Sequence, residues 1–125
     1  KVFCIDGDGS IIMHMGSLSV IGDIGPKNFY HILINNESHE SVGGQSTSAK
    51  NINFSDLVKA NNYKKTYKTS TEADLVTSLS TFSNLTGPSF LEVKVSLGHR
   101  KKLGRPTIKP VENKKSFMKF VKKDN

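Results

Sequence analysis

The chain has 125 residues, 35% of them hydrophobic, a size and composition that fit one folded domain or a piece of one. Its only cysteine, Cys4, excludes an internal disulfide framework and favours a reducing, cytoplasmic location. We expect neither a signal peptide nor a membrane anchor, because no apolar run approaches the roughly 18 residues of a membrane-spanning helix.

The formal net charge of +7 raises the question of nucleic-acid binding, since clustered Lys and Arg release counterions from phosphate backbones. The basic residues are concentrated after Gly98, and neither an aromatic stacking platform nor a nucleic-acid motif accompanies them. We therefore interpret most of them as a solvated surface and predict no nucleic-acid partner; a basic nucleic-acid binder is the alternative that a salt titration would test.

The first predicted element is a strand from Val2 to Ile5 that leads into the turn Gly7-Asp8-Gly9. Ser10 then caps a helix, which ends at Gly22 or at Gly25-Pro26 and has the apolar positions Ile11, Ile12, Met15, Leu18 and Ile21. This helix is predicted to be the crossover to a second, parallel strand.

The second strand is predicted from Phe29 to Ile34, and residues 35–51 read as a long loop without secondary structure, which a domain tolerates mainly for function. Because the chain opens inside a strand that the pattern places centrally, we expect further strands and helices before Lys1.

The rest of the chain alternates between helices and strands. The predicted elements are a helix from Phe54 to Ala60 capped by Asn53, a strand from Tyr63 to Tyr67, a helix over 73–82 capped by Ser70 or Thr71, a strand over 90–95 and a last helix from Glu112 to Lys122. This order predicts an α/β fold with an open, mainly parallel sheet and helices on both faces.

Two polar motifs follow the first two strands. Gly7-Asp8-Gly9-Ser10 comes after one and Asn35-Asn36 after the other, and 25 residues lie between Gly9 and Asn35. The carboxyl ends of parallel strands meet at one edge of a sheet, so Asp8 and Asn36 are expected to share one ion. Carboxylate and amide oxygens suit Mg²⁺, while Gly7, Gly9 and Ser10 let backbone N–H groups approach a diphosphate. The motifs predict a magnesium-diphosphate site.

This arrangement of Gly-Asp-Gly and Asn-Asn resembles the signature of thiamine diphosphate enzymes. Within them, residues 9–18 and 35–45 are similar to the phosphonopyruvate decarboxylases, and so are Leu103-Gly104-Arg105-Pro106 and residues 110–114. The resemblance covers nearly the whole chain. It implies a C-terminal diphosphate- and Mg²⁺-binding domain over 1–125, incomplete at its start, and a backbone carbonyl of Ser38 as the third protein ligand of the metal.

Further candidates lie near these motifs. His39 and Glu40 follow the metal ligands on the loop and are predicted to transfer protons or to orient the substrate. Gln45 is expected to make an amide contact, and Arg100 and Arg105 are candidates for binding an anionic substrate, although an exposed arginine without a role is the commoner outcome.

The resemblance implies the non-oxidative decarboxylation of 3-phosphonopyruvate to phosphonoacetaldehyde and CO2, with thiamine diphosphate and Mg²⁺ as cofactors, in phosphonate biosynthesis. It also implies a pyrimidine-binding domain, in the same or a partner chain, that carries the activating glutamate, and a homo-oligomer with an anionic 2-oxo acid as substrate. The alternatives are a sulfopyruvate decarboxylase or another 2-oxo acid decarboxylase subunit, and a non-catalytic cofactor-binding module.

Overall fold

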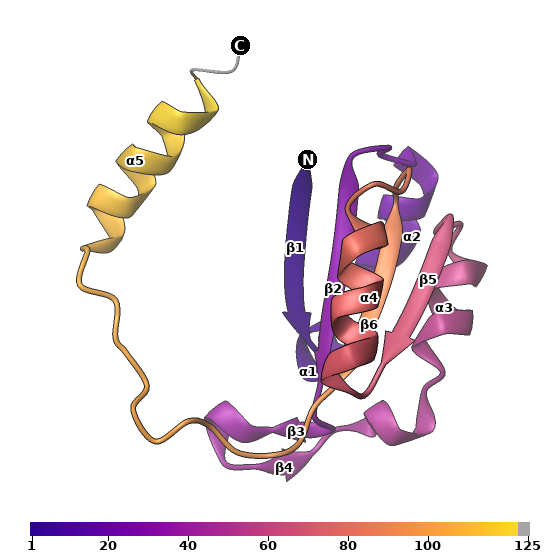
Figure 1. Cartoon of the computed structure of the whole chain (residues 1–125), viewed down its shortest axis with the longest axis horizontal. Helices are drawn as coiled ribbons and strands as arrows, with labels where there is room; N and C mark the ends of the chain where they lie inside the picture. Colours follow the sequence, from indigo (N-terminus) through magenta and orange to yellow (C-terminus); the bar gives the residue numbers. More distant parts are fainter. Residues whose placement is uncertain (123–125) are drawn as a thin grey trace.

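The computed structural model describes residues 1–122 and contains a four-stranded parallel sheet (Figure 1). The strands β1 (Val2–Gly7), β2 (Phe29–Asn35), β5 (Lys65–Thr69) and β6 (Ser89–Lys94) lie in the order β1-β2-β6-β5. Every neighbouring pair is parallel, so all four strands end at the same edge. β6 is central and almost wholly buried, as expected for an inner strand of a parallel sheet.

Helices cover both faces of the sheet. The chain forms α1 (Asp8–Met13) and α2 (Gly16–Ile24) between β1 and β2, α3 (Phe54–Ala60) before β5, and α4 (Glu72–Phe82) between β5 and β6. The chain moves outward along the sheet from β2 to β5 and returns inward to β6. With right-handed crossovers, this reversal places α4 on the face opposite to the other three helices (Figure 1).

Two hydrophobic clusters hold these layers together. The cluster under α1, α2 and α3 is built from Ile11, Leu18, Leu33, Ala49, Phe54, Val58, Tyr63 and Phe90. The cluster under α4 is built from Tyr30, Phe82, Leu91 and Val93. Alternate residues of β2 and β6 belong to different clusters, as the period of two along a strand requires. These observations confirm the predicted α/β fold with helices on both faces.

Several predicted boundaries were wrong. The first helix begins at Asp8 and is interrupted, because Ser17 donates its N–H to the carbonyl of His14, only three residues back, and Gly16 is a poor helix former. Its second half ends at Ile24 with Gly25 in the left-handed region, the later of the two predicted ends. The caps Asn53 and Thr71 are confirmed, since each accepts a backbone N–H in the first turn of its helix.

The segment predicted to be an irregular loop contains secondary structure. It forms a small antiparallel hairpin, β3 (Ser38–His39) with β4 (Gln45–Ser46), and the 3-10 turns η1 (Glu40–Val42) and η2 (Ser48–Asn51). β5 begins two residues later than predicted. Within the described residues β1 is an edge strand with Val2, Phe3 and Ile5 exposed, and the expectation of further strands before Lys1 stays a prediction.

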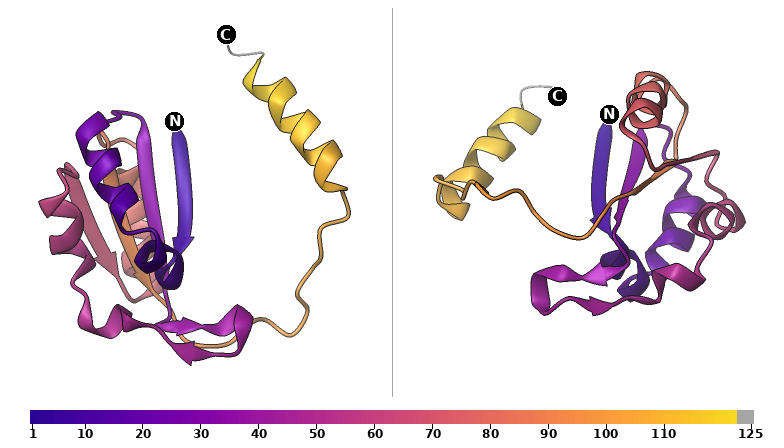
Figure 2. Two further views of the ribbon diagram at one scale, coloured as in Figure 1. Left: turned by 180° about the vertical axis from the view of Figure 1, so that it is seen from behind. Right: turned by 60° about the horizontal axis from the view of Figure 1, so that its bottom comes forward.

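The C-terminal segment leaves the sheet after β6. Residues 95–109 carry no helix or strand, and α5 (Pro110–Val121) stands away from the sheet (Figures 1 and 2). Its apolar side chains, among them Phe117 and Phe120, are exposed. This helix begins two residues earlier than predicted, with proline in its first turn. No helix within residues 1–122 is long and apolar enough to cross a membrane.

Close packing of α2 on the end of α3 gives a test of the fold. A Cβ on Gly22 would lie 1.7 Å from the carbonyl oxygen of Asn61, whereas one on Gly16 of the same helix would meet nothing within 4 Å. We expect Gly22→Ala to lower the free energy of unfolding of the full-length protein by about 1–3 kcal/mol, as overpacking does, and Gly16→Ala to leave it unchanged or raise it. Chemical denaturation measures both, and equal stabilities for the two variants would contradict this packing.

Candidate functional site

A groove lies at the carboxyl edge of the sheet. The strands β1 and β2 both end at this edge (Figure 1). Its lining comes from the β1–α1 turn, the end of β2 and the first half of the hairpin segment. The lining residues are Gly7, Asp8, Gly9, Ser10, Met13, Ile34, Asn36, Ser38, His39, Glu40, Ser41 and Val42. All the residues predicted to bind the diphosphate or the metal lie in this one groove, and so do His39 and Glu40.

Asp8 supplies a buried carboxylate to the groove. Its side chain is at the start of α1, is only 2% exposed and accepts a hydrogen bond from the hydroxyl of Thr47. Thr47 directly follows residues 45–46 of the hairpin segment, so this hydrogen bond ties the Asp8 carboxylate to that segment. No side chain caps the N-terminus of α1, so the N–H groups of Gly9 and Ser10 point out of its first turn without a side-chain acceptor.

The two adjacent asparagines do different work. Asn35 is 1% exposed, donates to Glu92 on β6 over 2.8 Å and accepts the N–H of Glu37 over 3.1 Å. Glu37 has a φ of 59°, a left-handed conformation that is rare outside glycine, and the contact with Asn35 supports this turn. Asn36 instead lines the groove. Asn35 is therefore structural, and Asn36 faces the site.

The hairpin brings His39 against the Gly-Asp-Gly turn. A Cβ on Gly9 would lie 2.5 Å from His39 Cε1 and 2.6 Å from Nδ1, so the imidazole occupies space that only glycine leaves open. Ser38 lies beside it, and its buried hydroxyl has no hydrogen-bond partner among the described residues. A buried polar atom of this kind normally has a partner, and its place in the groove indicates a polar ligand.

A hydrogen-bond network of Asp6, His31 and Tyr63 holds the Ser10 side chain. Asp6 accepts from Ser10 over 3.1 Å and lies 2.8 Å from His31 Nε2, while His31 Nδ1 lies 3.1 Å from the Tyr63 hydroxyl. Burial lowers the pKa of His31, although the carboxylate of Asp6 opposes this. We assign a neutral imidazole that donates to Asp6 and accepts from Tyr63.

In the same network, burial alone would raise the pKa of Asp6, but hydrogen bonds from His31, Cys4 and Ser10 outweigh it and hold that pKa below its ordinary value. Burial raises the pKa of Tyr63, so its hydroxyl keeps the proton that it donates. The hydroxyl proton of Ser10 is committed to Asp6, which leaves the backbone N–H of Ser10 for an anion in the groove.

The predicted substrate residues Gln45, Arg100 and Arg105 do not line this groove. Gln45 is exposed on β4, opposite His39. Arg100 is exposed in the segment after β6, and Arg105 lines a separate groove near the start of α5. The predicted contacts of these three residues with substrate stay predictions.

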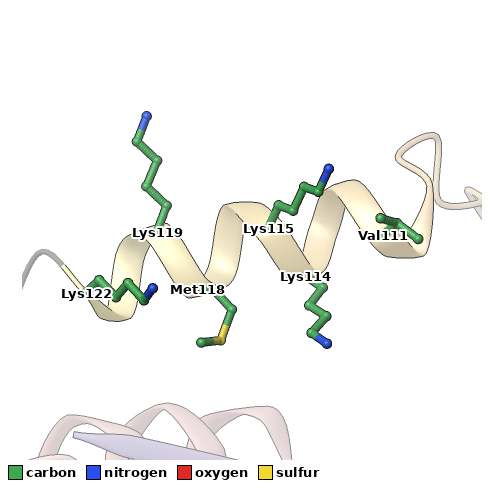
Figure 3. Close-up of a pocket in the computed structure, with 6 residues that line it drawn as sticks. All are labelled: Val111, Lys114, Lys115, Met118, Lys119 and Lys122. Atoms are coloured by element: carbon green, nitrogen blue, oxygen red, sulfur yellow. The ribbon is translucent and has the colours of Figure 1, made fainter.

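A further hollow runs along α5 and is unlike the sheet-edge groove. It is lined by Val111, Lys114, Lys115, Met118, Lys119 and Lys122 (Figure 3). Figure 3 shows Met118 and Lys114 on one side of the helix and Lys115 and Lys119 on the other. Its lining contains neither a carboxylate nor a histidine, and one helix supplies all of it.

Sequence reasoning missed two supporting residues. Thr47 holds Asp8 across 39 residues of sequence, and Glu92 holds Asn35 across 57. Glu92 had a visible signal, since a carboxylate inside an otherwise apolar buried strand needs a partner. Thr47 had no such signal, because residues 35–51 showed no periodic pattern from which their fold could be predicted.

The fold and the groove together define a class of site. A buried carboxylate, a neighbouring amide oxygen, uncapped helix N–H groups and an unpartnered buried hydroxyl lie at the carboxyl edge of a parallel sheet, between its first two strands. These donors and acceptors fit a diphosphate together with a hard divalent cation.

Comparison with known proteins identifies the family. Residues 1–93 match the family described as "Thiamine pyrophosphate enzyme, C-terminal TPP binding domain", and the chain belongs to this family. The cofactor of this family is thiamine diphosphate, which these enzymes typically bind with Mg²⁺.

Curated relatives agree with this assignment. The chain is 32% identical over 120 residues to a phosphonopyruvate decarboxylase of Streptomyces viridochromogenes, covering 96% of this chain and 30% of the relative. It is 48% identical over 60 residues to the sulfopyruvate decarboxylase subunit beta of Methanocaldococcus jannaschii, covering 47% of this chain and 32% of the relative. A sulfopyruvate decarboxylase of Methanosarcina acetivorans is 28% identical over 117 residues, which cover 93% of this chain and 30% of the relative. The chain thus spans about a third of the length of these relatives.

Proposed function

We propose that this chain is the diphosphate-binding domain of a thiamine diphosphate- and Mg²⁺-dependent decarboxylase that converts 3-phosphonopyruvate to phosphonoacetaldehyde and CO2 in phosphonate biosynthesis. The observation that carries the proposal is the single groove in which Asp8, Asn36, Gly9 and His39 meet. The family match and the decarboxylase names of the relatives support the reaction class.

The chain's own residues would hold the cofactor at its diphosphate end. Asp8 and the amide oxygen of Asn36, with the backbone carbonyl of Ser38, are the proposed ligands of Mg²⁺, since oxygen ligands of this kind suit that ion. The N–H groups of Gly9 and Ser10 would bind the diphosphate, to which Gly7 gives close access. When bound, thiamine diphosphate supplies the electron sink that lets a 2-oxo acid lose CO2.

His39 is the proposed proton-transfer residue. Its imidazole packs on Gly9, so it stays beside the cofactor end that Asp8 anchors. An imidazole can act as a general acid or base near neutral pH, and it can supply the proton that replaces the lost carboxylate. Glu40, the second predicted catalytic residue, lies in the same groove. Gln45, Arg100 and Arg105 stay proposed contacts of the substrate's anionic group.

The complete catalytic unit is proposed to include a pyrimidine-binding domain, in the same chain or a partner chain, within a homo-oligomer in the cytoplasm. Two observations support a covering partner. Val2, Phe3 and Ile5 expose apolar surface on β1, and one relative is named as a beta subunit. A sulfopyruvate decarboxylase subunit is the second candidate, because the identity over 60 residues to such subunits reaches 48%.

An assay of the complete enzyme with each substrate distinguishes the phosphonopyruvate from the sulfopyruvate decarboxylase. The complete enzyme with Mg²⁺ and thiamine diphosphate is incubated separately with phosphonopyruvate and sulfopyruvate, and the release of each aldehyde is timed. We expect kcat/KM to be larger for phosphonopyruvate by about tenfold or more, a difference of about 1.4 kcal/mol in transition-state binding. A preference for sulfopyruvate would assign the second candidate. Cofactor binding without turnover of either acid would favour a non-catalytic module.

A further inference from the structure

We propose that Glu40 is a positioning residue that orients the Asn36 amide and ties the metal site to the C-terminal segment. The proposal rests on the function proposed above. Glu40 begins the 3-10 turn η1, directly after His39, and its carboxylate accepts two hydrogen bonds from different parts of the chain. One comes from the groove and the other from the segment after β6.

The first hydrogen bond fixes which atom of Asn36 can meet the metal. Asn36 Nδ2 donates to Glu40 Oε2 over 2.9 Å, and Asn36 Oδ1 accepts the N–H of Ser38 over 3.1 Å. A carboxylate can only accept, so the partner atom of Asn36 must be the amide nitrogen. Glu40 thereby holds the amide oxygen on the side of Ser38, the other proposed ligand, and excludes the flipped amide that would present N–H groups to a cation.

The second hydrogen bond reaches the start of the C-terminal segment. The N–H of Gly98 donates to Glu40 Oε1 over 2.7 Å, across 58 residues of sequence. Gly98 has a φ of 110°, a conformation that other residues rarely adopt, so the chain turns at this contact. In Figures 1 and 2 the segment after β6 passes beside β3 and β4 before it leaves toward α5.

Both oxygens of Glu40 are therefore engaged as acceptors within the protein. The two hydrogen bonds hold the carboxylate in one orientation, toward Asn36 and Gly98, which suits a positioning role. This is the place of an outer-shell partner, whose loss typically weakens metal binding without removing a ligand. Glu40 would thus affect metal binding only by orienting the side chain of Asn36.

Glu40→Gln tests this role in the complete enzyme. The glutamine keeps the shape, but its amide nitrogen would face one of the two N–H donors. We expect the Mg²⁺ concentration for half-maximal thiamine diphosphate binding to rise about tenfold or more, as for other outer-shell changes. Excess Mg²⁺ should recover most of the lost kcat, the pH profile of kcat should keep its shape, and hydrogen exchange at the Gly98 amide should become faster.

Glu72→Gln, an exposed carboxylate at the start of α4, is the control for the loss of one charge. Unchanged Mg²⁺ dependence in Glu40→Gln would overturn the proposal. A different outcome would assign Glu40 to proton transfer instead: kcat falls strongly, excess Mg²⁺ does not recover it, and the pH profile loses one limb. Asp8→Asn in the same binding assay reports on the proposed function separately. If Asp8→Asn loses the cofactor while Glu40→Gln binds Mg²⁺ normally, only the role of Glu40 is wrong.

Discussion

Asp8→Asn is expected to abolish retention of thiamine diphosphate by the full-length enzyme. The change removes the one buried carboxylate in the groove while keeping its shape, and the asparagine oxygen can still accept the hydroxyl of Thr47. Mg²⁺ would then lose its charged protein ligand. We expect the affinity for the cofactor to fall by more than about 100-fold, beyond the loss typical of an outer-shell change, and decarboxylation to fall with it.

Titration of the cofactor at fixed Mg²⁺, followed by intrinsic fluorescence or calorimetry, measures this loss. Asp23→Asn is the matched control, because Asp23 is an exposed aspartate in α2 and does not line the groove. A circular dichroism melt establishes that both variants are folded. An Asp8→Asn enzyme that binds Mg²⁺ and thiamine diphosphate as the wild type does would sink the site assignment.

The second large effect separates two neighbouring amides. Asn35→Ala removes the hydrogen bond to Glu92, which is 2% exposed and whose other described partner is Lys68 at 3.4 Å. We expect the free energy of unfolding to fall by about 2–3 kcal/mol, the cost typical of removing a buried hydrogen bond to a charged group.

Asn36→Ala should lower the affinity for the cofactor and leave the free energy of unfolding nearly unchanged. Asn36 lines the groove and its amide is a proposed metal ligand, so cofactor affinity should fall sharply. Its hydrogen bonds to Glu40 and Ser38 lie nearer the surface, and the change in stability should stay within about 0.5 kcal/mol. Urea denaturation and cofactor titration of both variants form the test. If both lose stability equally, or if Asn35→Ala is the one that loses the cofactor, the division of roles is wrong.

The location of the site was predictable because it follows from topology. Motifs that end two neighbouring parallel strands must lie at one sheet edge, whatever the detailed packing, and Gly7, Asp8 and Asn36 do meet there. The caps Asn53 and Thr71 were predictable for a similar reason, since a cap depends only on the first turn of its own helix.

What the sequence could not supply depends on distant contacts. The place of Asn36 at the site was predicted, but the hydrogen bond from Asn35 to Glu92 was not, because it joins residues 57 positions apart. The path after β6 was also unpredictable, because residues 95–109 carry no periodic pattern. The structure places Arg105 in a separate groove near the start of α5, which no pattern in this segment indicated.

The central claim is that one divalent ion binds between Asp8 and Asn36. Replacing Mg²⁺ by Mn²⁺ in crystals of the complete enzyme with thiamine diphosphate, and locating the metal by its anomalous scattering, tests this most directly. The predicted result is a single peak in the groove, within about 2.0–2.3 Å of an Asp8 carboxylate oxygen, the Asn36 amide oxygen and the Ser38 carbonyl, as hard cations bind oxygen ligands. A peak that contacts neither Asp8 nor Asn36 while the cofactor is bound would contradict the account.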